Sequence, residues 1–473
     1  MQLTDQTASH DPKTEKFPWK LGLILYSLSY LPMMLFSKAY FWDDWFTHRL
    51  QEADFRKHLV VGGNWPLRAI IEVDLLGLNP MFFHAATFVC FLVGGWLLFR
   101  ILTCFEFLNL NQRSLVTILF LILPINSARV AMINFHYSLS LLIFYFAWYL
   151  LVTKKSITWR LLSIPLFLIS FDTVALIVFF VVPCCHLGYL MYLDQKIKKI
   201  YVALISATLL LLAPLYYIVD HQINPPQGGY ATMYTPQKLG ILRALLLLLI
   251  CAAVGVWLLW KHRTNLGSAK RQLLIVLGIT VTFVGATPYI IGGHLVDISY
   301  WMLNFVPGAS DWNSRHQLVL GLGLSLLICG VIGDLDSRFK RQSLRVLFGL
   351  CVVWNLTYMH GYYLDSIKQN EIISAIRQSN DFNDSKIIMV NDLADRFNAR
   401  GRGIRSYEFD GMFDFAKSAS DVKTITGYSY VKCNDEFIPD TLMTITASNG
   451  RLEATITGKV GIEISVESIR PCG

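Results

Sequence analysis

Two adjacent carboxylates, Asp43 and Asp44, are the residues whose type and spacing most clearly allow chemistry. They lie in an aromatic segment that reads Tyr40-Phe41-Trp42-Asp43-Asp44-Trp45-Phe46. Two like charges at short range raise the pKa of one member of a pair, and paired carboxylates can accept protons or hold a cation. The alternative role is structural, because aspartate also caps helix N-termini and interacts favourably with the helix dipole.

The composition of the chain indicates the surroundings of this pair. Apolar residues make up 54% of the 473 residues and charged residues only 16%, whereas soluble domains average about 25% charged residues. The sequence therefore predicts an integral membrane protein. The net charge of +8 does not indicate nucleic acid, because lysine and arginine cluster between the apolar runs and no nucleic-acid motif occurs. We expect a lipid bilayer and no nucleic acid as a partner.

Eleven apolar segments divide residues 1–360, and a membrane span needs about 20 residues. The first segment is too long for the apolar core of a cleavable signal peptide, so we expect it to remain as an anchor. The predicted fold is an all-α polytopic membrane domain with about 11 transmembrane helices. The segments are Trp19–Phe36, Met81–Leu102, Leu115–Pro124, His136–Val152, Leu161–Phe171, Val174–Leu193, Tyr201–Val219, Ile241–Trp260, Leu273–Ile291, Leu318–Ile332 and Leu344–Met359.

Basic residues predict the orientation of these spans. Every second loop is basic, beginning with Lys13, Lys16 and Lys20 before the first segment, and basic loops stay in the cytoplasm. We therefore expect a cytoplasmic N-terminus, with the loop 37–80 and the C-terminus on the trans side. Aromatic neighbours would hold the acidic pair at the lipid headgroups, and the pattern from Trp45 to Leu59 suits a helix along the membrane surface.

The tail, residues 361–473, has the composition of a water-soluble module. We predict a small α+β domain with a β-meander on the trans side. Asn449-Gly450 is a preferred two-residue turn for a β-hairpin. The expected elements are a helix over Ser366–Arg377 and strands over Ile387–Val390, Thr441–Thr446, Leu452–Thr457 and Val460–Val466.

Two cysteines, Cys433 and Cys472, fall in this tail. On an oxidising side of the membrane they could form a disulfide that closes a loop of about 40 residues. The other seven cysteines lie in or beside apolar segments, where cysteine behaves as a small apolar residue.

An acidic pair in the first trans loop, in a chain of about eleven spans with a soluble trans tail, resembles the GT-C class of glycosyltransferases, which use polyprenyl-phosphate-linked sugars. The segment Gly62-Gly63-Asn64-Trp65-Pro66-Leu67-Arg68 is similar to the Gly-Arg-Pro type segment of bacterial Gtr-type glucosyltransferases, which decorate O-antigen. It departs from that pattern because Trp65-Pro66 precedes Leu67-Arg68 instead of a tight Gly-Arg pair.

The resemblance implies transfer of a hexose from a polyprenyl-phosphate carrier, such as an undecaprenyl carrier, to a surface glycan of the lipopolysaccharide type. The reaction would take place on the periplasmic side of a bacterial inner membrane. A loop-one carboxylate would act as general base on the acceptor hydroxyl. Asp43 is favoured as this base by the family pattern, with Asp44 orienting the base or the acceptor, although the two roles could be exchanged.

The leaving group of this reaction is a lipid phosphate, whose developing charge needs cations or fixed dipoles. Arg315 and His316 precede the tenth span, and a guanidinium suits phosphate oxygens; an interfacial anchor for the span is the alternative. Arg68 and Arg129 are further candidates on the same side. His136, at the start of a span, fits a hydrogen-bonded packing residue better.

Two further features could contact the sugar. Asp172 lies where the chain turns between the fifth and sixth spans, and polar groups at membrane depth are functional candidates, although a turn cap explains it equally well. The loop His221–Gln237 combines glycine, proline and two tyrosines that could close over a sugar, or it simply connects two spans.

No cofactor is firmly predicted. The sequence has no His/Cys spacing typical of zinc and no glycine-rich phosphate loop after a strand. Mg²⁺ or Mn²⁺ at Asp43 and Asp44 is conceivable, because both ions prefer oxygen ligands.

Three other functions fit the sequence less well. A transporter or flippase of lipid-linked saccharides would carry charged residues within several spans, whereas the charges here lie in loops or at span ends. An O-antigen polymerase would have its large trans loop within the chain, and a structural assembly protein would leave the acidic pair without a role. The sequence favours the glycosyltransferase.

Overall fold

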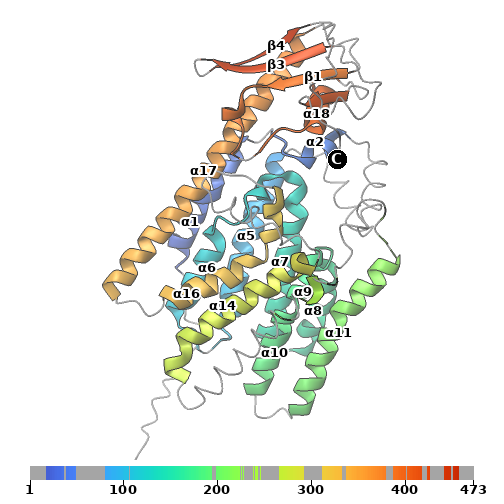
Figure 1. Ribbon diagram of the computed structural model, residues 1–473. Coiled ribbons are helices and arrows are strands. Elements are labelled where there is room, and N and C mark those ends of the chain that lie inside the picture. The colour runs from blue at the N-terminus through green and yellow to red at the C-terminus, as the bar shows by residue number, and fades with distance from the viewer. Residues whose placement is uncertain are drawn as a thin grey trace, which may run out of the picture.

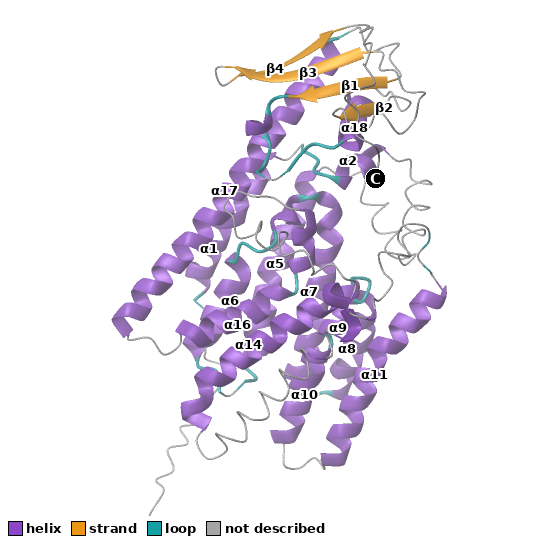
Figure 2. Cartoon of the chain, viewed as in Figure 1, coloured by secondary structure: helices purple, strands orange, loops and turns teal. Residues whose placement is uncertain are grey.

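The computed structural model is dominated by helices, with a small sheet at one end (Figure 1; Figure 2). It describes residues 18–36, 39–49, 80–105, 107–193, 199–223, 266–291, 312–332, 337–379, 387–400, 402–417, 423–426, 441–448 and 451–457, with single positions between 225 and 246.

The membrane part consists of α-helices joined by short 3₁₀ helices. The α-helices are α1 (Trp19–Tyr30), α2 (Asp43–Arg49), α5 (Pro80–Leu102), α6 (Leu110–Ile122), α7 (Phe135–Thr153), α8 (Ile157–Ser170), α9 (Val174–Phe179), α10 (Val181–Leu193), α11 (Lys199–Ile223), α14 (Leu266–Ile291), α16 (Leu320–Ile332) and α17 (Ser337–Gln378). The 3₁₀ helices are η1 (Leu31–Phe36), η2 (Ser127–Val130), η3 (Met132–Asn134) and η5 (Trp312–Gln317).

Four of the described segments are long and apolar enough to cross a membrane, namely Pro80–Leu102, Met132–Thr153, Val174–Met191 and Arg271–Ile291. Three shorter apolar helices accompany them, at Leu110–Ile122, Ile157–Ser170 and Leu320–Ile332. The chain is therefore a helical membrane protein, as predicted. The number of eleven spans stays a prediction, and the expected span Ile241–Trp260 lies almost entirely outside the described residues.

Prolines explain where two predicted spans are interrupted. The first span changes from α1 to the 3₁₀ helix η1 after Tyr30, and Pro32 lacks the N–H that a continuing α-helix needs there. The sixth divides into α9 and α10 at Phe180. Pro183, in the first turn of α10, is tolerated at such a position and would disrupt one continuous helix.

Helix α6 is shorter than a bilayer-spanning helix but is buried within the protein. Its N-terminus is fixed by a capping box between Asn109 and Gln112, so it begins five residues before the predicted segment. Its 13 residues extend about 20 Å at 1.5 Å per residue. The chain then continues through η2 and η3 to α7, and such irregular backbone is tolerated at membrane depth only within protein or water.

Helix α17 joins the membrane part to the tail without a break. It runs for 42 residues, or about 63 Å, and contains both the predicted last span and the predicted tail helix Ser366–Arg377. No proline interrupts it. The predicted domain boundary at 360/361 therefore falls inside one helix, and the change of composition there marks a change of surroundings along a continuous element.

The tail contains a four-stranded sheet in the order β2-β1-β3-β4. Its strands are β1 (Ile387–Asp392), β2 (Lys423–Thr426), β3 (Thr441–Ser448) and β4 (Arg451–Thr457). The hairpin prediction is confirmed, because β3 and β4 pair antiparallel with Ser448 opposite Arg451. The rest of the predicted β-meander stays a prediction, because its third strand, Val460–Val466, lies outside the described residues. Strand β1 pairs parallel with both β2 and β3. Parallel pairing requires a crossover, and α18 (Ser406–Lys417) lies between β1 and β2.

The hydrophobic core of the tail includes a residue of the acidic loop. Trp45, in α2, is buried among apolar side chains of α17, α18, β1 and β3. The other buried members are Ile372, Ile373, Ile376, Ile388, Val390, Ala394, Ile404, Phe409, Met412, Phe413, Met443 and Ile445. Residues separated by about 400 positions thus share one core, and the loop is anchored to the tail by hydrophobic burial.

Gly411 of α18 allows this close packing, and its substitution tests it. An added Cβ would lie 2.9 Å from both Cβ and the carbonyl oxygen of Trp45, so the backbone of α2 would have to move. We expect Gly411→Ala to destabilise the folded protein by about 1–3 kcal/mol, measured as a lower thermal midpoint in detergent. Gly403→Ala is the control, because nothing lies within 4 Å of its added Cβ. Equal midpoints for the two variants would contradict the close contact.

Candidate functional site

The backbone immediately before the acidic pair has an unusual conformation. Trp42 has φ 52°, a positive value that no other non-glycine residue of the described chain adopts. Its N–H donates to Glu408 Oε2 at 3.1 Å, and its ring lies 5.2 Å from that of Trp312. Residues other than glycine rarely adopt a positive φ, and such backbone strain persists only where several contacts impose it. Tertiary contacts of Trp42 therefore set the direction of the backbone that carries Asp43 and Asp44.

Asp44 has the surroundings of a structural residue. Its buried carboxylate accepts three backbone hydrogen bonds: Phe41 N to Oδ2 at 3.0 Å, Met132 N to Oδ2 at 2.8 Å and Ile133 N to Oδ1 at 2.8 Å. Burial raises the pKa of Asp44 to about 7, although the three N–H groups, which favour the ionised form, oppose the rise. Asp44 ties the start of α2 to the segment between α6 and α7.

Asp43 is only half-buried and has a single described hydrogen bond. The hydroxyl of Tyr407 donates to its Oδ1 at 3.0 Å. Among the described residues, none donates to Oδ2. The two neighbouring carboxylates thus differ: Asp44 is occupied by backbone donors, and Asp43 keeps one oxygen for another partner. This difference agrees with the preference for Asp43 as the base.

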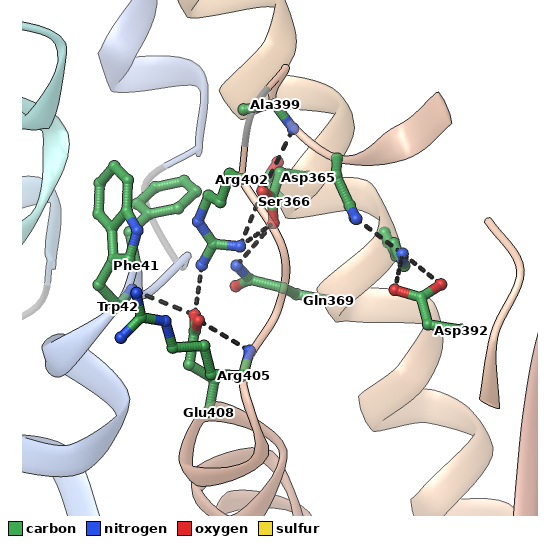
Figure 3. Close-up of polar contacts among 12 residues, drawn as sticks. Phe41, Trp42, Asp365, Ser366, Gln369, Asp392, Ala399, Arg402, Arg405 and Glu408 are labelled. Atoms are coloured by element: carbon green, nitrogen blue, oxygen red, sulfur yellow. Dashed lines mark hydrogen bonds and ion pairs between the residues drawn. The ribbon is translucent and has the colours of Figure 1, made fainter. Parts of the chain in front are cut away.

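A buried ionic cluster holds the tail against the acidic loop (Figure 3). The guanidinium of Arg402 pairs with Asp365 of α17, at 3.0 Å from Nη1 to Oδ2, and with Glu408 of α18. All three side chains are fully buried. Glu408 also accepts from Arg405 N at 3.1 Å, and Gln369 donates to Asp365 at 3.1 Å. Breaking such a pair leaves an uncompensated buried charge, at a cost of about 3–5 kcal/mol.

Arg129 lies on the segment that Asp44 anchors, in η2. It is only 4% exposed, and its guanidinium carbon is 4.1 Å from the ring centre of Tyr30 and 4.2 Å from that of Phe91. Its Nε donates to Asn126 O at 2.9 Å. Nη1 is buried without a hydrogen-bond partner, and no carboxylate of the described residues pairs with Arg129. A buried cation of this kind is costly unless an anion joins it.

The segment before the tenth predicted span packs onto η2. The Ser314 hydroxyl lies 3.1 Å from that of Ser127 and accepts from Ala128 N at 2.8 Å. The Arg315 guanidinium carbon is 4.3 Å from the ring centre of Trp312. His316 lies against Tyr289, with ring centres 4.6 Å apart. Because Trp312 also touches Trp42, η5 meets both the acidic loop and η2.

Other predicted residues are not brought to this cluster. Asp172 lies in the turn between α8 and α9, and α9 packs on α14 and α11, whereas α2 packs on α18 and η3. His136 Nδ1 lies 2.6 Å from Ile133 O, which agrees with a packing residue. Arg68, Cys433 and Cys472 lie outside the described residues, as do the Gly62–Arg68 segment, most of the loop His221–Gln237, Val460–Val466 and the surface helix beyond Arg49.

A metal ion fits the acidic pair poorly. The Asp44 oxygens already accept three N–H groups, and no group of three His, Cys, Asp or Glu ligands occurs within the described part of the chain. We therefore derive no step through Mg²⁺ or Mn²⁺.

Tyr407 and the buried cluster of Arg402, Asp365 and Glu408 were missed by sequence reasoning. In the sequence, Arg402, Asp365 and Glu408 are only charged residues among apolar ones, a pattern that is common in solvated helices and loops, and Tyr407 carries no signal of its own. Their contacts join positions separated by up to 366 residues along the chain.

The described structure defines a helical membrane protein whose acidic loop, tail and the segment between α6 and α7 meet at one end of the bundle (Figure 1). No model of a known protein family matches the sequence, and no curated protein matches it.

Substitution of Asp44 tests its structural role. In Asp44→Asn an amide group replaces one carboxylate oxygen, so at least one of the three N–H donors loses its acceptor. An unsatisfied buried donor costs about 1–3 kcal/mol, and we expect a clearly lower thermal midpoint in detergent. Asp43→Asn is the matched control and should keep the wild-type midpoint. Unchanged stability of Asp44→Asn would contradict the assignment.

Proposed function

We propose that this protein is a membrane glycosyltransferase that moves a hexose from a polyprenyl-phosphate carrier to a hydroxyl of a surface glycan. One observation carries the proposal. Asp43 has an oxygen that accepts no hydrogen bond from the described residues, and its neighbour Asp44 binds the segment that carries the buried Arg129, which has no carboxylate partner among those residues. Such a transfer needs a base for the acceptor hydroxyl and a cationic site for the leaving phosphate.

The proposed reaction uses Asp43 as general base. Its Oδ2 takes the proton of the acceptor hydroxyl while the hydroxyl oxygen forms a bond to the anomeric carbon of the sugar. The bond between that carbon and the phosphate oxygen breaks, and polyprenyl phosphate leaves with the electron pair. Asp44 acts on the reaction only by fixing the loop, because its carboxylate is occupied by Phe41, Met132 and Ile133.

Arg129 is the favoured partner for the phosphate. Its Nη1 has no acceptor within the described part of the chain, and the rings of Tyr30 and Phe91 lie against the guanidinium. A charge-assisted hydrogen bond to a phosphate oxygen would compensate the buried cation and stabilise the leaving group. Arg315, half-buried on the adjacent η5, is a second cation on the same side of the bundle.

The orientation in the membrane is part of the proposal. The acidic loop and the tail lie at one end of the bundle, and the basic start of α17, with Arg338, Lys340 and Arg341, lies at the other (Figure 1). Basic segments stay in the cytoplasm. The site and the tail are then on the periplasmic side of a bacterial inner membrane, where lipid-linked sugars meet surface glycans such as O-antigen.

A transporter or flippase of lipid-linked saccharides is the second candidate. Arg129, without a carboxylate partner among the described residues, favours it as much as it favours the transferase, because both would bind a lipid phosphate. A polymerase of lipid-linked saccharides would also use both groups. Only the enzymes need Asp43 Oδ2, which accepts no hydrogen bond from the described residues. A polymerase would change glycan chain length instead of adding single sugars.

Asp43→Asn tests the base. An amide cannot take the proton, and loss of a general base typically costs about 10²–10⁴-fold in rate. We expect membranes with this variant to have lost transfer, measured by the mass of the surface glycan with and without the protein. Asp395→Asn, an exposed carboxylate in the tail, is the control and should leave the added mass unchanged. Full modification by Asp43→Asn would exclude the base.

Arg129→Met tests the anion site. Methionine keeps apolar packing between the two rings but removes the cation, and replacing a buried unpaired charge does not weaken the fold. We expect an unchanged or higher thermal midpoint and at least about 10-fold weaker binding of undecaprenyl phosphate, since a charge-assisted hydrogen bond contributes about 1.5–3 kcal/mol. Arg396→Gln, exposed in the tail, is the control. Wild-type affinity in Arg129→Met would remove this residue from the site.

A further inference from the structure

The first turn of α18 reaches the acidic loop through two consecutive residues. The Tyr407 hydroxyl donates to Asp43 Oδ1 at 3.0 Å. The neighbouring Glu408 accepts from Trp42 N at 3.1 Å. The tail thus contacts both the backbone before the acidic pair and the carboxylate that remains available for chemistry.

Glu408 is itself held by an ion pair. Arg402 pairs with both Glu408 and Asp365 of α17 (Figure 3). Because the cluster is fully buried and joins three separate chain segments, it holds the start of α18 at a definite position relative to α17 and the loop. Buried ionic groups contribute little net stability, so we attribute their presence here to geometry.

The same face of α18 packs directly on α2. Tyr407 and Gly411 are four residues apart, so their side-chain positions lie on one face of the helix. Gly411 lies against the backbone of Trp45. Tyr407 therefore approaches Asp43 from a helix that cannot shift along α2 without a clash.

We propose that Tyr407 is a positioning residue, which holds the Asp43 carboxylate so that Oδ2 is presented to the acceptor hydroxyl, and that the tail thereby completes the site. This inference rests on the proposed function of Asp43 as base. A hydrogen bond to Oδ1 selects one rotation of the carboxylate, and correct orientation of a reacting group lowers the barrier by avoiding unproductive conformers.

The chemistry of Tyr407 suits a permanent donor. Burial, followed by the nearby carboxylates of Asp43 and Glu408, raises the pKa of the Tyr407 hydroxyl well above its ordinary value. The hydroxyl therefore keeps its proton and does not itself act as a base. Its role is to orient the carboxylate.

Tyr407→Phe removes only the hydroxyl and tests this role. With membranes that contain the full chain, a polyprenyl-phosphate hexose and the surface glycan, we expect kcat to fall at least about 10-fold. The KM for the donor and the thermal midpoint should stay within twofold and within about 2 °C of wild type, because one hydrogen bond at a half-buried group contributes about 1 kcal/mol or less. Tyr363→Phe, an exposed tyrosine of α17, is the control.

The outcomes separate this inference from the proposed function. If Asp43→Asn is inactive and Tyr407→Phe has the kcat of wild type, the positioning role is wrong and the base assignment stands. A lower kcat that comes with a lower thermal midpoint would show a purely structural role, and a higher KM with unchanged kcat would place Tyr407 in substrate binding; each result overturns the inference. If Asp43→Asn remains active, the proposed function itself fails.

Discussion

The arrangement of this protein depends on the carboxylate of Asp44 and the three backbone N–H groups that bind it. Two of these donors belong to η3, so one side chain fixes the acidic loop to the segment that carries Arg129. A buried carboxylate with this number of donors is satisfied only in one geometry. The acidic loop is thereby fixed to the segment between α6 and α7, and Ser314 in turn links that segment to η5, which precedes α16.

The tail also fixes the acidic loop, through contacts with Trp45 and Trp42. Trp45 enters its hydrophobic core, and the cluster of Arg402, Asp365 and Glu408 binds the backbone at Trp42. Helix α17 runs through both parts without a break, so movement of the tail would have to bend a helix or disrupt the acidic loop. The tail is therefore structurally continuous with the candidate site.

Two features of the cluster are unfavourable for the folded protein alone. Trp42 has a strained backbone, and Arg129 is a buried cation without a carboxylate partner among the described residues. Strain and unpaired charge of this kind concentrate at functional sites, where ligands or chemistry use them. Trp42 precedes the acidic pair, and Arg129 lies on the segment next to the one that Asp44 binds; both features are consistent with the proposed anion site.

The sequence by itself determined the membrane class, many helix positions, the β3–β4 hairpin and the location of the acidic pair after the first apolar segment. These follow from local properties: apolar composition, span length, proline positions and the turn chemistry of Asn449-Gly450. Only the tertiary structure decided that α17 is continuous, that β1 pairs in parallel, which aspartate is available and that Tyr407 binds it. These features depend on contacts between distant residues, such as the 88 positions between Asp44 and Met132 and the 364 between Asp43 and Tyr407. Local spacing carries no information about such contacts, because they are selected by how well the whole set of surfaces packs together.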